Sequence, residues 1–384
     1  MIKTLLPLCL LSLSLFATTP APLEATWHKT FGGSKDDVAK AIIATEDAGA
    51  IMISTTRSKG AGKTDISAIK LDANGEKLWE KTYGGDRKEE AYAITKLQDG
   101  NFIIVGSTKS YGKGGYDYFI IKIDKEGNKL WEKTAGGIAK DEATAVTATN
   151  DGGMLVVGSS KSSGKGSYNY YAIKLDSNGK LLWEQTAGGK DWDLATGVAE
   201  MDDGSFLLVG KSESFGDNGY DGYVVKLSQK GKFLWEKTFG GKKEDSIYAI
   251  AKGIDGSFLL VGKTKSYKDK KGDSFIIKLD KEGKKQRIKT YGNLGKDKAT
   301  AVTALKDGGY AIAGSSREMS YGREDCILIM MDKDANVLGS NHYGGKKEDI
   351  AYGITQLQDG ALMLVGDTKT YGHGGMDSFV VHVK

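Results

Sequence analysis

From residue 25 onward the chain alternates apolar and polar positions in short runs, and turns that contain glycine separate these runs. One unit reads EAYAITKL, QDG, NFIIVGST, KSYGKGGYD, YFIIKI, DKEG and KLWEKT. Alternation that is rich in β-branched and aromatic residues predicts strands. Glycine supplies the positive φ that hairpin turns of the DG and DxxG kinds need. The pattern therefore predicts four strands in each unit.

The unit repeats with a fixed step of 52 residues, without insertions or deletions. The tryptophans that mark this step are Trp27, Trp79, Trp131, Trp183 and Trp235, and the same step leads on to Arg287 and Gly339. Glycine pairs recur at Gly32–Gly33, Gly84–Gly85, Gly136–Gly137, Gly188–Gly189, Gly240–Gly241 and Gly344–Gly345, with Gly292–Asn293 in the sixth copy. A period of this length is typical of a repeat architecture rather than of separate domains.

The two ends of the repeat are offset by one strand. ATWHKTF at the start is a lone fourth-strand segment, whereas DSFVVHVK at the end lacks the fourth strand that should follow it. A closed ring joins the two segments and removes exposed edges. We therefore predict an all-β fold over residues 25–384: a seven-bladed β-propeller of four-stranded antiparallel blades, whose last blade takes Ala25–Phe31 as its outer strand. Small residues in the columns of Ala39 and Ala41 are expected where the innermost strands converge.

Residues 1–17 are predicted to be a secretory signal peptide, followed by a short linker over residues 18–24. Lys3 precedes an apolar run from Leu5 to Phe16, which is too short to span a membrane, and Ala17 marks the approximate cleavage site. Nothing later approaches the ~18 apolar residues that a membrane span needs. We expect an exported protein that is periplasmic or secreted and has no membrane span.

Composition narrows the function classes further. The 54 basic and 50 acidic residues leave a formal charge of +4, which argues against a nucleic-acid partner because such proteins concentrate basic residues on one face. The histidines, His28, His342, His373 and His382, show no ligand spacing, so no metal site is predicted. After the leader Cys326 has no partner for an intrachain disulfide, and its neighbours CILIMM predict a thiol in a buried strand.

The turns before the tryptophans carry a recognisable motif. LDANGEKLW, IDKEGNKLW and LDSNGKLLW resemble the Asp-turn-Gly-…-Trp docking motif of quinoprotein-like propellers. The 52-residue unit with its YGG extension is similar to secreted bacterial and archaeal propeller repeats, whose function is mostly unassigned. The resemblance implies that each tryptophan wedges against the neighbouring blade. It brings no quinone cofactor or catalysis to this chain, because the sequence contains no distinct, non-repeated set of quinone ligands.

One acidic position recurs in all seven units, four residues after the second glycine of each pair. This acidic column consists of Asp37, Glu89, Asp141, Asp193, Asp245, Asp297 and Asp349. In a ring these side chains are expected to face one another near the channel mouth. Two interpretations stay open: a cation-binding or acid/base site, or short side chains that accept backbone N–H bonds and order each glycine loop. Sevenfold repetition favours the structural interpretation, since catalysis needs carboxylates in unlike environments.

A second acidic position lies at the entry to each third strand. This entry column consists of Asp65, Asp117, Asn169, Asp221, Asp273, Asp325 and Asp377. Because Asn169 replaces an acid without disturbing the register, the column is predicted to serve hydrogen bonding rather than charge.

The loops between the second and third strands mix tyrosine, lysine and glycine, and they should share a face with the glycine-pair loops. The candidate binding residues on this face are Tyr111, Tyr116, Tyr168, Tyr220, Tyr267 and Tyr371, together with Trp192 in a glycine-pair loop. Aromatic side chains here would stack on sugars, fill the pockets of a partner, or only pack their own turns. The sequence leaves these alternatives open.

Loops of equal length in every blade argue against an enzyme, because a catalytic constellation is built only once. We therefore expect a non-catalytic protein-interaction scaffold in the cell envelope, whose partner is an unidentified envelope protein. A carbohydrate-binding propeller with several equivalent shallow sites for a glycan is one alternative. An enzyme that uses the acidic channel mouth is the other.

Overall fold

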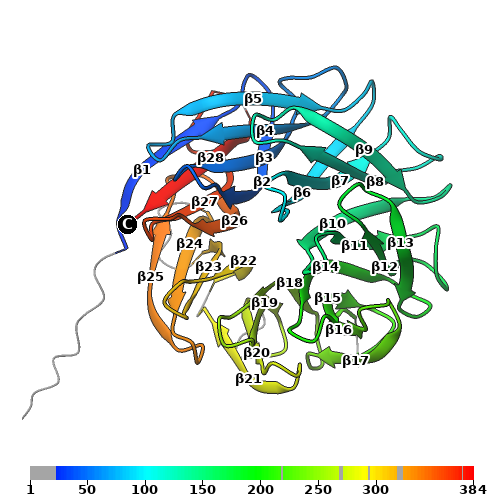
Figure 1. Cartoon of the computed structure of the whole chain (residues 1–384). Coiled ribbons are helices and arrows are strands. Elements are labelled where there is room, and N and C mark those ends of the chain that lie inside the picture. Colours follow the sequence, from blue (N-terminus) through cyan, green and yellow to red (C-terminus); the bar gives the residue numbers. More distant parts are fainter. Residues whose placement is uncertain (1–22, 218, 268–270, 293–294, 318–322, 374) are drawn as a thin grey trace, which may run out of the picture.

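The computed structural model describes residues 23–384 except 218, 268–270, 293–294, 318–322 and 374, so the predicted signal peptide lies outside the described residues. The described chain forms seven four-stranded antiparallel sheets arranged around a central axis, as Figure 1 shows. This confirms the predicted all-β, seven-bladed propeller. Blades 1 to 6 follow the chain from β2–β5 to β22–β25, and blade 7 contains β26, β27, β28 and β1.

The strands fall into four classes by their distance from the axis. The innermost strands are β2 (Asp37–Ala44), β6 (Glu89–Lys96), β10 (Asp141–Ala148), β14 (Asp193–Glu200), β18 (Asp245–Lys252), β22 (Asp297–Ala304) and β26 (Asp349–Gln356). The second strands are β3 (Ala50–Thr56), β7 (Phe102–Thr108), β11 (Met154–Ser160), β15 (Phe206–Ser212), β19 (Phe258–Thr264), β23 (Tyr310–Ser316) and β27 (Leu362–Thr368). Strands of both classes run between the two faces of the ring, and the loops and turns that connect them lie at these faces.

The third strands are β4 (Asp65–Leu71), β8 (Asp117–Ile123), β12 (Asn169–Leu175), β16 (Asp221–Leu227), β20 (Asp273–Leu279), β24 (Asp325–Met331) and β28 (Asp377–Val383). The outer strands are β5 (Lys77–Tyr83), β9 (Lys129–Ala135), β13 (Leu181–Ala187), β17 (Phe233–Phe239), β21 (Lys285–Tyr291), β25 (Val337–Tyr343) and β1 (Ala25–Phe31). The outer strands begin two residues before the tryptophan positions, because the pairing with the third strands already starts there.

The first strand of the chain closes the ring. β1 pairs antiparallel with β28, from Ala25 opposite Val383 to Phe31 opposite Ser378, and Figure 1 shows these two strands side by side. Leu23, in the predicted linker, is also fixed: its carbonyl accepts the Asn341 amide at 2.6 Å and the Tyr343 hydroxyl at 2.7 Å. Leu23, two residues before β1, therefore ties blade 7 to the outer strand of blade 6.

The apolar core is divided among the junctions between blades. Each of seven clusters of buried side chains combines residues of two neighbouring blades. At the first junction, Ile53 and Ile66 of blade 1 pack with Phe102 and Phe119 of blade 2. Burial of such side chains contributes roughly 1.5–3 kcal/mol each. No blade has a complete core of its own, so the ring is the unit that folds.

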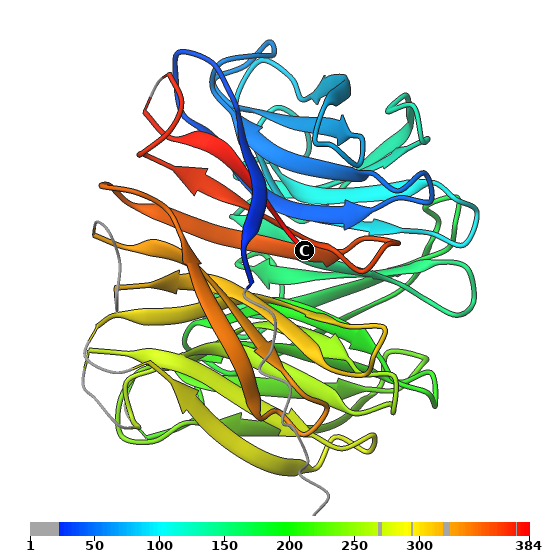
Figure 2. The same cartoon turned by 90° about the vertical axis from the view of Figure 1, so that its left-hand side faces the viewer.

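Two unlike faces result from this topology, and Figure 2 shows the molecule from the side. At the loop end, the glycine-pair loops lie beside the loops between second and third strands. Asp37, where β2 begins, pairs with Thr56, where β3 ends, so the loop before β2 and the loop after β3 are neighbours. At the turn end lie the short turns such as 45–49 and 72–76. A belt of backbone bonds joins the blades at the loop end. Each acidic-column N–H donates across a junction at 2.6–2.9 Å, as Asp141 does to Tyr116.

Every innermost strand contains a β-bulge at the residue that faces the channel. In β2 the register shifts between Ala39 and Ala41, which leaves Lys40 without a partner on β3. The seven bulged residues, called the bulge ring below, are Lys40, Tyr92, Thr144, Thr196, Tyr248, Thr300 and Tyr352. A bulge increases the local twist and re-aims its side chain. The bulges thereby release one residue per blade from the ladder and turn it toward the axis.

Small residues occupy the places where blades approach one another. Ala39 is buried, and a Cβ on Gly353 would lie 3.0 Å from the Cα of Ala41, so bulk is excluded there. Ile247 is the exception in the Ala39 column. A Cβ on Gly222 would lie 3.0 Å from its Cδ1, so this glycine of blade 4 provides the space that the larger side chain of blade 5 fills.

The tryptophans pack against the next blade, as the sequence motif implies. A Cβ on Gly127 would lie 2.9 Å from Trp79 Cζ3, and the Trp79 indole N–H donates to the Lys125 carbonyl at 3.3 Å. The same contact recurs as Trp27 on Gly75, Trp131 on Gly179, Trp183 on Gly231 and Trp235 on Gly283. Where Arg287 replaces the tryptophan, Ala335 replaces the glycine and the guanidinium donates to the Asp334 carbonyl at 3.1 Å. Six of the seven outer strands are thus clamped to the turn of the next blade, and β25, which has Gly339 at this position, is the exception.

Candidate functional site

The acidic column lies inside the blade junctions, not around the channel mouth. All seven side chains are 3% exposed or less, and the channel is lined instead by the bulge ring and the residues below it. The expectation that these carboxylates face one another across the channel is therefore wrong. Asp37 points to the same side of its strand as the buried Ala39, whereas Lys40 turns to the axis.

Six of the seven carboxylates of the acidic column are each seen to order two loops at once. In these six junctions the carboxylate accepts the N–H of the second glycine of the pair at 2.7–2.9 Å. Asp141 also accepts the hydroxyl of Ser162 at 2.7 Å and that of Ser160, which ends β11. These bonds satisfy a buried charge, as the structural interpretation requires.

The entry column meets the acidic column at the first glycine of each pair. A Cβ on Gly136 would lie 2.6 Å from both Asp117 Oδ1 and Asp141 Oδ2. The same arrangement surrounds Gly32, Gly84, Gly188, Gly240, Gly292 and Gly344. In blade 3 the Asn169 amide donates to the Lys165 carbonyl at 3.1 Å, which agrees with the predicted hydrogen-bonding role. Seven glycines therefore lie between side chains that leave no room for a methyl group.

Two carboxylates at one junction influence each other. Burial raises the pKa of Asp65, and the nearby Glu89 adds to the shift. Burial raises the pKa of Asp221 to about 6, with further contributions from Asp245 and Asp217. Asp221 Oδ1 is buried and finds no hydrogen-bond partner within the described residues. This end of the ring therefore holds carboxylates whose ionisation opposes folding.

The loop tyrosines divide into two groups. In the first, the hydroxyls of Tyr111, Tyr267 and Tyr371 donate at 2.8–3.0 Å to the carbonyl of the first glycine in the glycine-pair loop that enters their blade. Their rings pack on Phe119, Phe275 and Phe379, with centroids 5.6–5.7 Å apart. These three side chains hold the glycine loop against its own blade, so packing accounts for them.

The second group lies just before the third strands, between loops of successive blades. The Tyr116 hydroxyl donates to Glu90 at 3.2 Å, and the Lys109 ammonium lies 4.5 Å from its ring centroid. The Lys211 ammonium lies 3.9 Å from the ring centroid of Tyr220. Tyr168 is 9% exposed and packs on Trp192 with centroids 4.9 Å apart. Among the predicted aromatic binding residues, Trp192 is thus supported from below and still 45% exposed.

A second apolar side chain accompanies Trp192 on the loop end. Ile138, in the glycine-pair loop that enters blade 3, is 86% exposed. Its loop is held by a bond from Gly115 N to the Ile138 carbonyl at 3.0 Å. Ile138 and Trp192 occupy successive junctions, and we call them the apolar loop pair. The sequence singled out Trp192 but missed Ile138, although an isoleucine at a position where five of the other six copies are polar was a visible signal.

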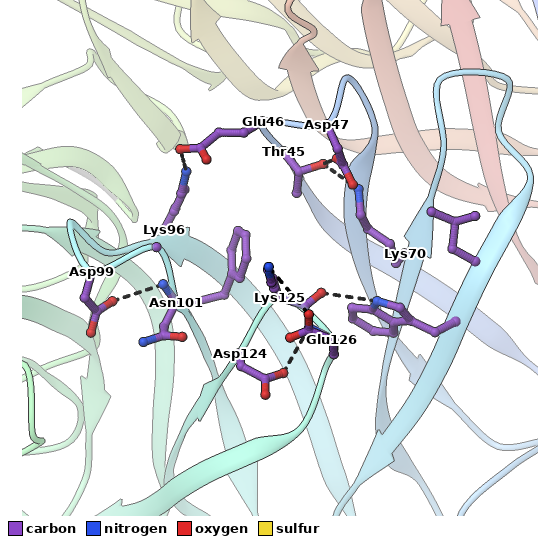
Figure 3. Close-up of a pocket in the computed structure, with 14 residues that line it drawn as sticks. Thr45, Glu46, Asp47, Lys70, Lys96, Asp99, Asn101, Asp124, Lys125 and Glu126 are labelled. Carbon is purple, nitrogen blue, oxygen red and sulfur yellow. Dashed lines mark hydrogen bonds and ion pairs between the residues drawn. The ribbon is translucent and has the colours of Figure 1, made fainter.

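A groove of about 820 Å³ opens at the turn end between blades 1 and 2, and Figure 3 shows its lining. Trp79 and Phe102 form apolar parts of its wall, while Asn101 and Glu126 supply polar groups. Lys96 pairs with Glu46 across one side. The groups Glu46, Lys96 and Asn101 have no equivalents in the next unit, where Gln98, Ala148 and Gly153 stand. The groove therefore differs from one junction to the next.

Buried lysines form a feature that sequence reasoning missed. The ammonium groups of Lys70, Lys122, Lys174 and Lys226 reach turn aspartates of the same blade at 2.6–3.2 Å. In blade 5 Lys278 instead donates to Ser257 at 2.6 Å and Tyr310 at 2.8 Å. Met330 and His382 take the place in blades 6 and 7. The recurring lysine of the third strand, in AIKLD and IIKID, was the signal for this lysine column.

Other sequence expectations concern isolated groups. Cys326 is buried, as predicted, and burial raises the pKa of its thiol well above the usual range. Within the described ranges, no group of three or more His, Cys, Asp or Glu side chains is arranged to hold a metal ion. The described part of the chain also contains no helix long and apolar enough to cross a bilayer.

Solved structures share the fold at low identity. The WD40 domain of Neurospora crassa Pan2 is 12% identical, with a TM-score of 0.54, over 90% of this chain and 88% of that one. Drosophila plexin A, solved in complex with semaphorin 1b, is 11% identical, with a TM-score of 0.54, over 94% and 87%. A fungal alcohol oxidase is 13% identical, with a TM-score of 0.52, over 94% and 76%. These proteins differ in function, so the likeness shows the fold alone.

Sequence comparison places the chain more specifically. The regulatory protein FlaEY of Caulobacter vibrioides is 24% identical over 96% of this chain, and the chain spans 39% of the length of FlaEY. The family described as outer membrane protein assembly factor BamB matches residues 62–264. Since that match covers more than half of the 384 residues, the chain belongs to this family of β-propeller proteins.

Proposed function

We propose that this protein is a non-catalytic protein-interaction scaffold of the cell envelope that binds its partner through the apolar loop pair. The exposure of Ile138 and Trp192 carries the proposal, because neither side chain is needed to close its own loop. Every other copy has a charged residue at the position of Trp192. Tryptophan supported by a second ring is typical of residues that dominate binding energy at interfaces.

The family supports this proposal in two ways. Its name describes an outer-membrane assembly factor, which favours an envelope location and agrees with the predicted signal peptide. The matching residues 62–264 contain both members of the apolar loop pair.

Plexin A, which shares the fold, was solved bound to a protein partner. The proposed partner is an envelope protein that presents an apolar patch, with acidic groups opposite Lys140 and Lys190, the lysines of these two loops.

Site-specific crosslinking tests the proposal. A photoreactive residue replaces Ile138 or Trp192 in cells that carry the protein in the envelope. Ile254, which is 71% exposed on a turn at the opposite end, is the matched control. We expect one protein adduct of defined mass from positions 138 and 192 and none from position 254.

A Trp192→Ala variant completes the test. It should remove the adduct formed at position 138 while the purified protein keeps its melting temperature within about 2 °C, since a surface side chain is lost. Equal adducts from positions 138 and 254, or no adduct from positions 138 and 192, would contradict the proposed surface.

Glycan binding is a second candidate, favoured by the groove at the turn end. Its volume of about 820 Å³ and its mixture of Trp79, Phe102, Asn101 and carboxylates suit a short saccharide, whose apolar face needs a ring and whose hydroxyls need amides and carboxylates. Because part of the lining is not repeated, this candidate has one groove rather than the several equivalent sites expected from sequence. Binding on a glycan array that Asn101→Ala and Glu126→Ala both weaken would support it, and an array without any binding would exclude it.

A further inference from the structure

Every outer strand contains a β-bulge at the residue before its tryptophan position. In β13 the register shifts between Lys174 and Leu175, which leaves Leu182 without a partner on β12. The extra residue is a leucine in blades 1, 2, 3, 4 and 6, Gln286 in blade 5 and Thr26 in blade 7. A bulge re-aims its side chain. The five leucines are 49–57% exposed, so the outer rim of the propeller holds apolar side chains in water.

Blades 3 and 4 are neighbours that each have a second exposed apolar residue beside this leucine. It is Leu181 in blade 3 and Phe233 in blade 4, whereas blades 1, 2 and 5 have lysine there. Trp183 joins the two blades: a Cβ on Gly231 would lie 2.6 Å from Trp183 Cε3, and the indole N–H donates to the Gln229 carbonyl at 3.2 Å. The side chains on either side of this contact are called the rim patch below: Leu181, Leu182, Phe233 and Leu234.

The turn over residues 228–232, which leads into the rim patch of blade 4, is basic. Its first residue is a serine, where the turns of blades 1, 2, 3, 5 and 6 have aspartate, and its charged residues are Lys230 and Lys232. These two lysines and Lys180 of blade 3 are exposed. Within the described residues, the salt bridges of blades 3 and 4 involve other lysines, and two of them neutralise Asp202 and Asp203. Three ammonium groups beside the rim patch are therefore open to a ligand.

The carboxylates close to the rim patch along the chain are held by groups of their own blade. Asp176 accepts two backbone N–H groups of its turn at 2.8–2.9 Å. Glu184 accepts the Tyr171 hydroxyl at 2.6 Å, and Glu236 accepts the Tyr223 hydroxyl. Both glutamates lie two residues beyond the bulges, toward the loop end. The segments 176–182 and 228–234 thus combine one carboxylate with three lysines.

A bilayer fits this combination better than a protein partner. The cores of protein interfaces are depleted in lysine and require a surface of complementary shape. Lysines border the rim patch, and its strands β13 and β17 lie on the convex circumference of the ring, as Figure 1 shows. Segments that lie on membranes combine protruding aliphatic and aromatic side chains with lysines that attract anionic headgroups.

We propose that the rim patch docks the propeller onto a bilayer that contains anionic phospholipid. The four apolar side chains enter the boundary between headgroups and acyl chains, and the ammonium groups of Lys180, Lys230 and Lys232 meet the lipid phosphates. Ile138 and Trp192 then lie at the end of the same two blades that is far from the bilayer. The proposal uses the expected envelope location and goes beyond the scaffold function, because this edge is separate from the apolar loop pair.

The repeat itself supplies substitutions that the outer strands and turns accept. Glutamine is native to the bulge of blade 5, so Leu182→Gln and Leu234→Gln remove apolar contact and introduce a residue that this position already holds. Asparagine is native to the position of Lys232 in blades 2 and 6, so Lys232→Asn removes one charge in the same way.

Blade 6 provides matched controls, because it has the same apolar pair beside an acidic turn. Val337 and Leu338 are exposed like the rim patch, but Asp332 and Asp334 lie in the turn before them. Leu338→Gln makes the same change at an equivalent bulge. Lys333→Gln removes one charge from this turn and introduces the residue that blade 4 has there.

Flotation with lipid vesicles tests the docking. The protein is used in its exported form, and the vesicles consist of phosphatidylcholine alone or of an equimolar mixture with phosphatidylglycerol. We expect the protein to bind the mixed vesicles about tenfold more strongly than phosphatidylcholine. Leu182→Gln, Leu234→Gln and Lys232→Asn should each weaken binding to the mixed vesicles by about fivefold, whereas the two blade 6 variants should change it by less than about twofold.

Four results would refute the proposal. Absence of binding to the mixed vesicles up to about 10 mM lipid excludes docking. Equal weakening by Leu338→Gln and Leu234→Gln refutes a specific role of blades 3 and 4. Equal binding to both kinds of vesicle refutes the role of the lysines. A dimer that sedimentation detects and that Leu234→Gln dissociates assigns the rim patch to a second copy of the chain instead.

Discussion

Buried charged side chains hold the loops at one end of the propeller and the turns at the other. The buried charge is negative at the loop end and positive at the turn end. At the loop end, carboxylates such as Asp141 are buried in the junctions and accept hydrogen bonds from loops. At the turn end, the buried partner is a lysine such as Lys174, and its Asp151 partner stays partly exposed. Loop-end contacts join different blades, whereas the lysine–aspartate pairs lie within one blade.

This difference indicates where the molecule tolerates change. The loop end combines a rigid layer of glycines and carboxylates with exposed side chains above it. Substitutions in the rigid layer disturb two blades together, while those at the exposed positions disturb neither. Ile138 and Trp192 are therefore free to serve a partner, although they lie within a few residues of Asp141 and Asp193.

The largest expected effect contrasts glycines at the two ends. At Gly136, which has φ near 141°, an added Cβ would lie 2.6 Å from two carboxylate oxygens, whereas Gly100 has φ near 83° and open space around it. Gly136→Ala should lower the free energy of unfolding by about 4 kcal/mol, and Gly100→Ala by about 1 kcal/mol. Denaturant unfolding measures both, and equal losses would contradict the picture of a crowded loop end.

The second contrast removes one carboxylate from each end. Asp141→Ala leaves four donors at a buried site without their acceptor, so it should lower the free energy of unfolding by about 3 kcal/mol. Asp151→Ala also removes bonds to Lys174, Thr149 and Gly153, but water can reach this site, so about 1.5 kcal/mol is expected. A larger loss for Asp151→Ala would reverse the roles assigned to the two ends.

Asp221→Asn should stabilise the protein, in contrast to the loss at Asp141. The folded-state pKa of about 6 lies above the ordinary value, so the folded chain binds the additional proton between about pH 4 and pH 6. The stability of the unaltered protein therefore falls as the pH rises through this window. Asparagine, as in Asn169, removes that fall and should raise the free energy of unfolding at pH 7 by about 1 kcal/mol. Unfolding curves at pH 4 and pH 7 check it, and an equal effect at both would refute a titrating Asp221.

The smallest effect is expected in the lysine column. Lys174→Met introduces the residue that blade 6 carries as Met330, and it leaves Asp151 at a surface where water replaces the lysine. The free energy of unfolding should change by less than about 1 kcal/mol, because an apolar side chain of similar length often replaces a buried ion pair without loss. A loss as large as that of Asp141→Ala would show that these lysines hold the ring together.

Much of the architecture could be predicted because the repeat multiplies weak signals. One tryptophan or one glycine pair says little, but a constant step of 52 residues and the incomplete units at both ends required a closed ring. The role of Ala25–Phe31 followed from that count. The bulges could not be predicted, since Lys40 and Ala39 follow the same alternation and only the ladder reveals the extra residue.

The site was less accessible to sequence reasoning, for a related reason. A column of acids has the same appearance whether it faces water or a junction, so Asp141 was placed at the mouth although its partners are a glycine and two serines. Tyr111 and Trp192 likewise both lie in loops at the same end of the ring. The fold decides that the Tyr111 hydroxyl holds the glycine-pair loop at Gly84 and that the Trp192 ring packs on Tyr168.

The joining of β1 to β28 also sets the order in which the molecule can mature. Thr26 and His382, which bond in the closed ring, are 356 positions apart along the chain. Contacts of such separation form late, because the entropy of closing the loop must be overcome first. Until the last strand emerges, a growing chain has an unpaired strand at its beginning and an open blade at its end, both able to pair with other chains. Although its parts are repeats, the ring therefore cannot be shortened one unit at a time.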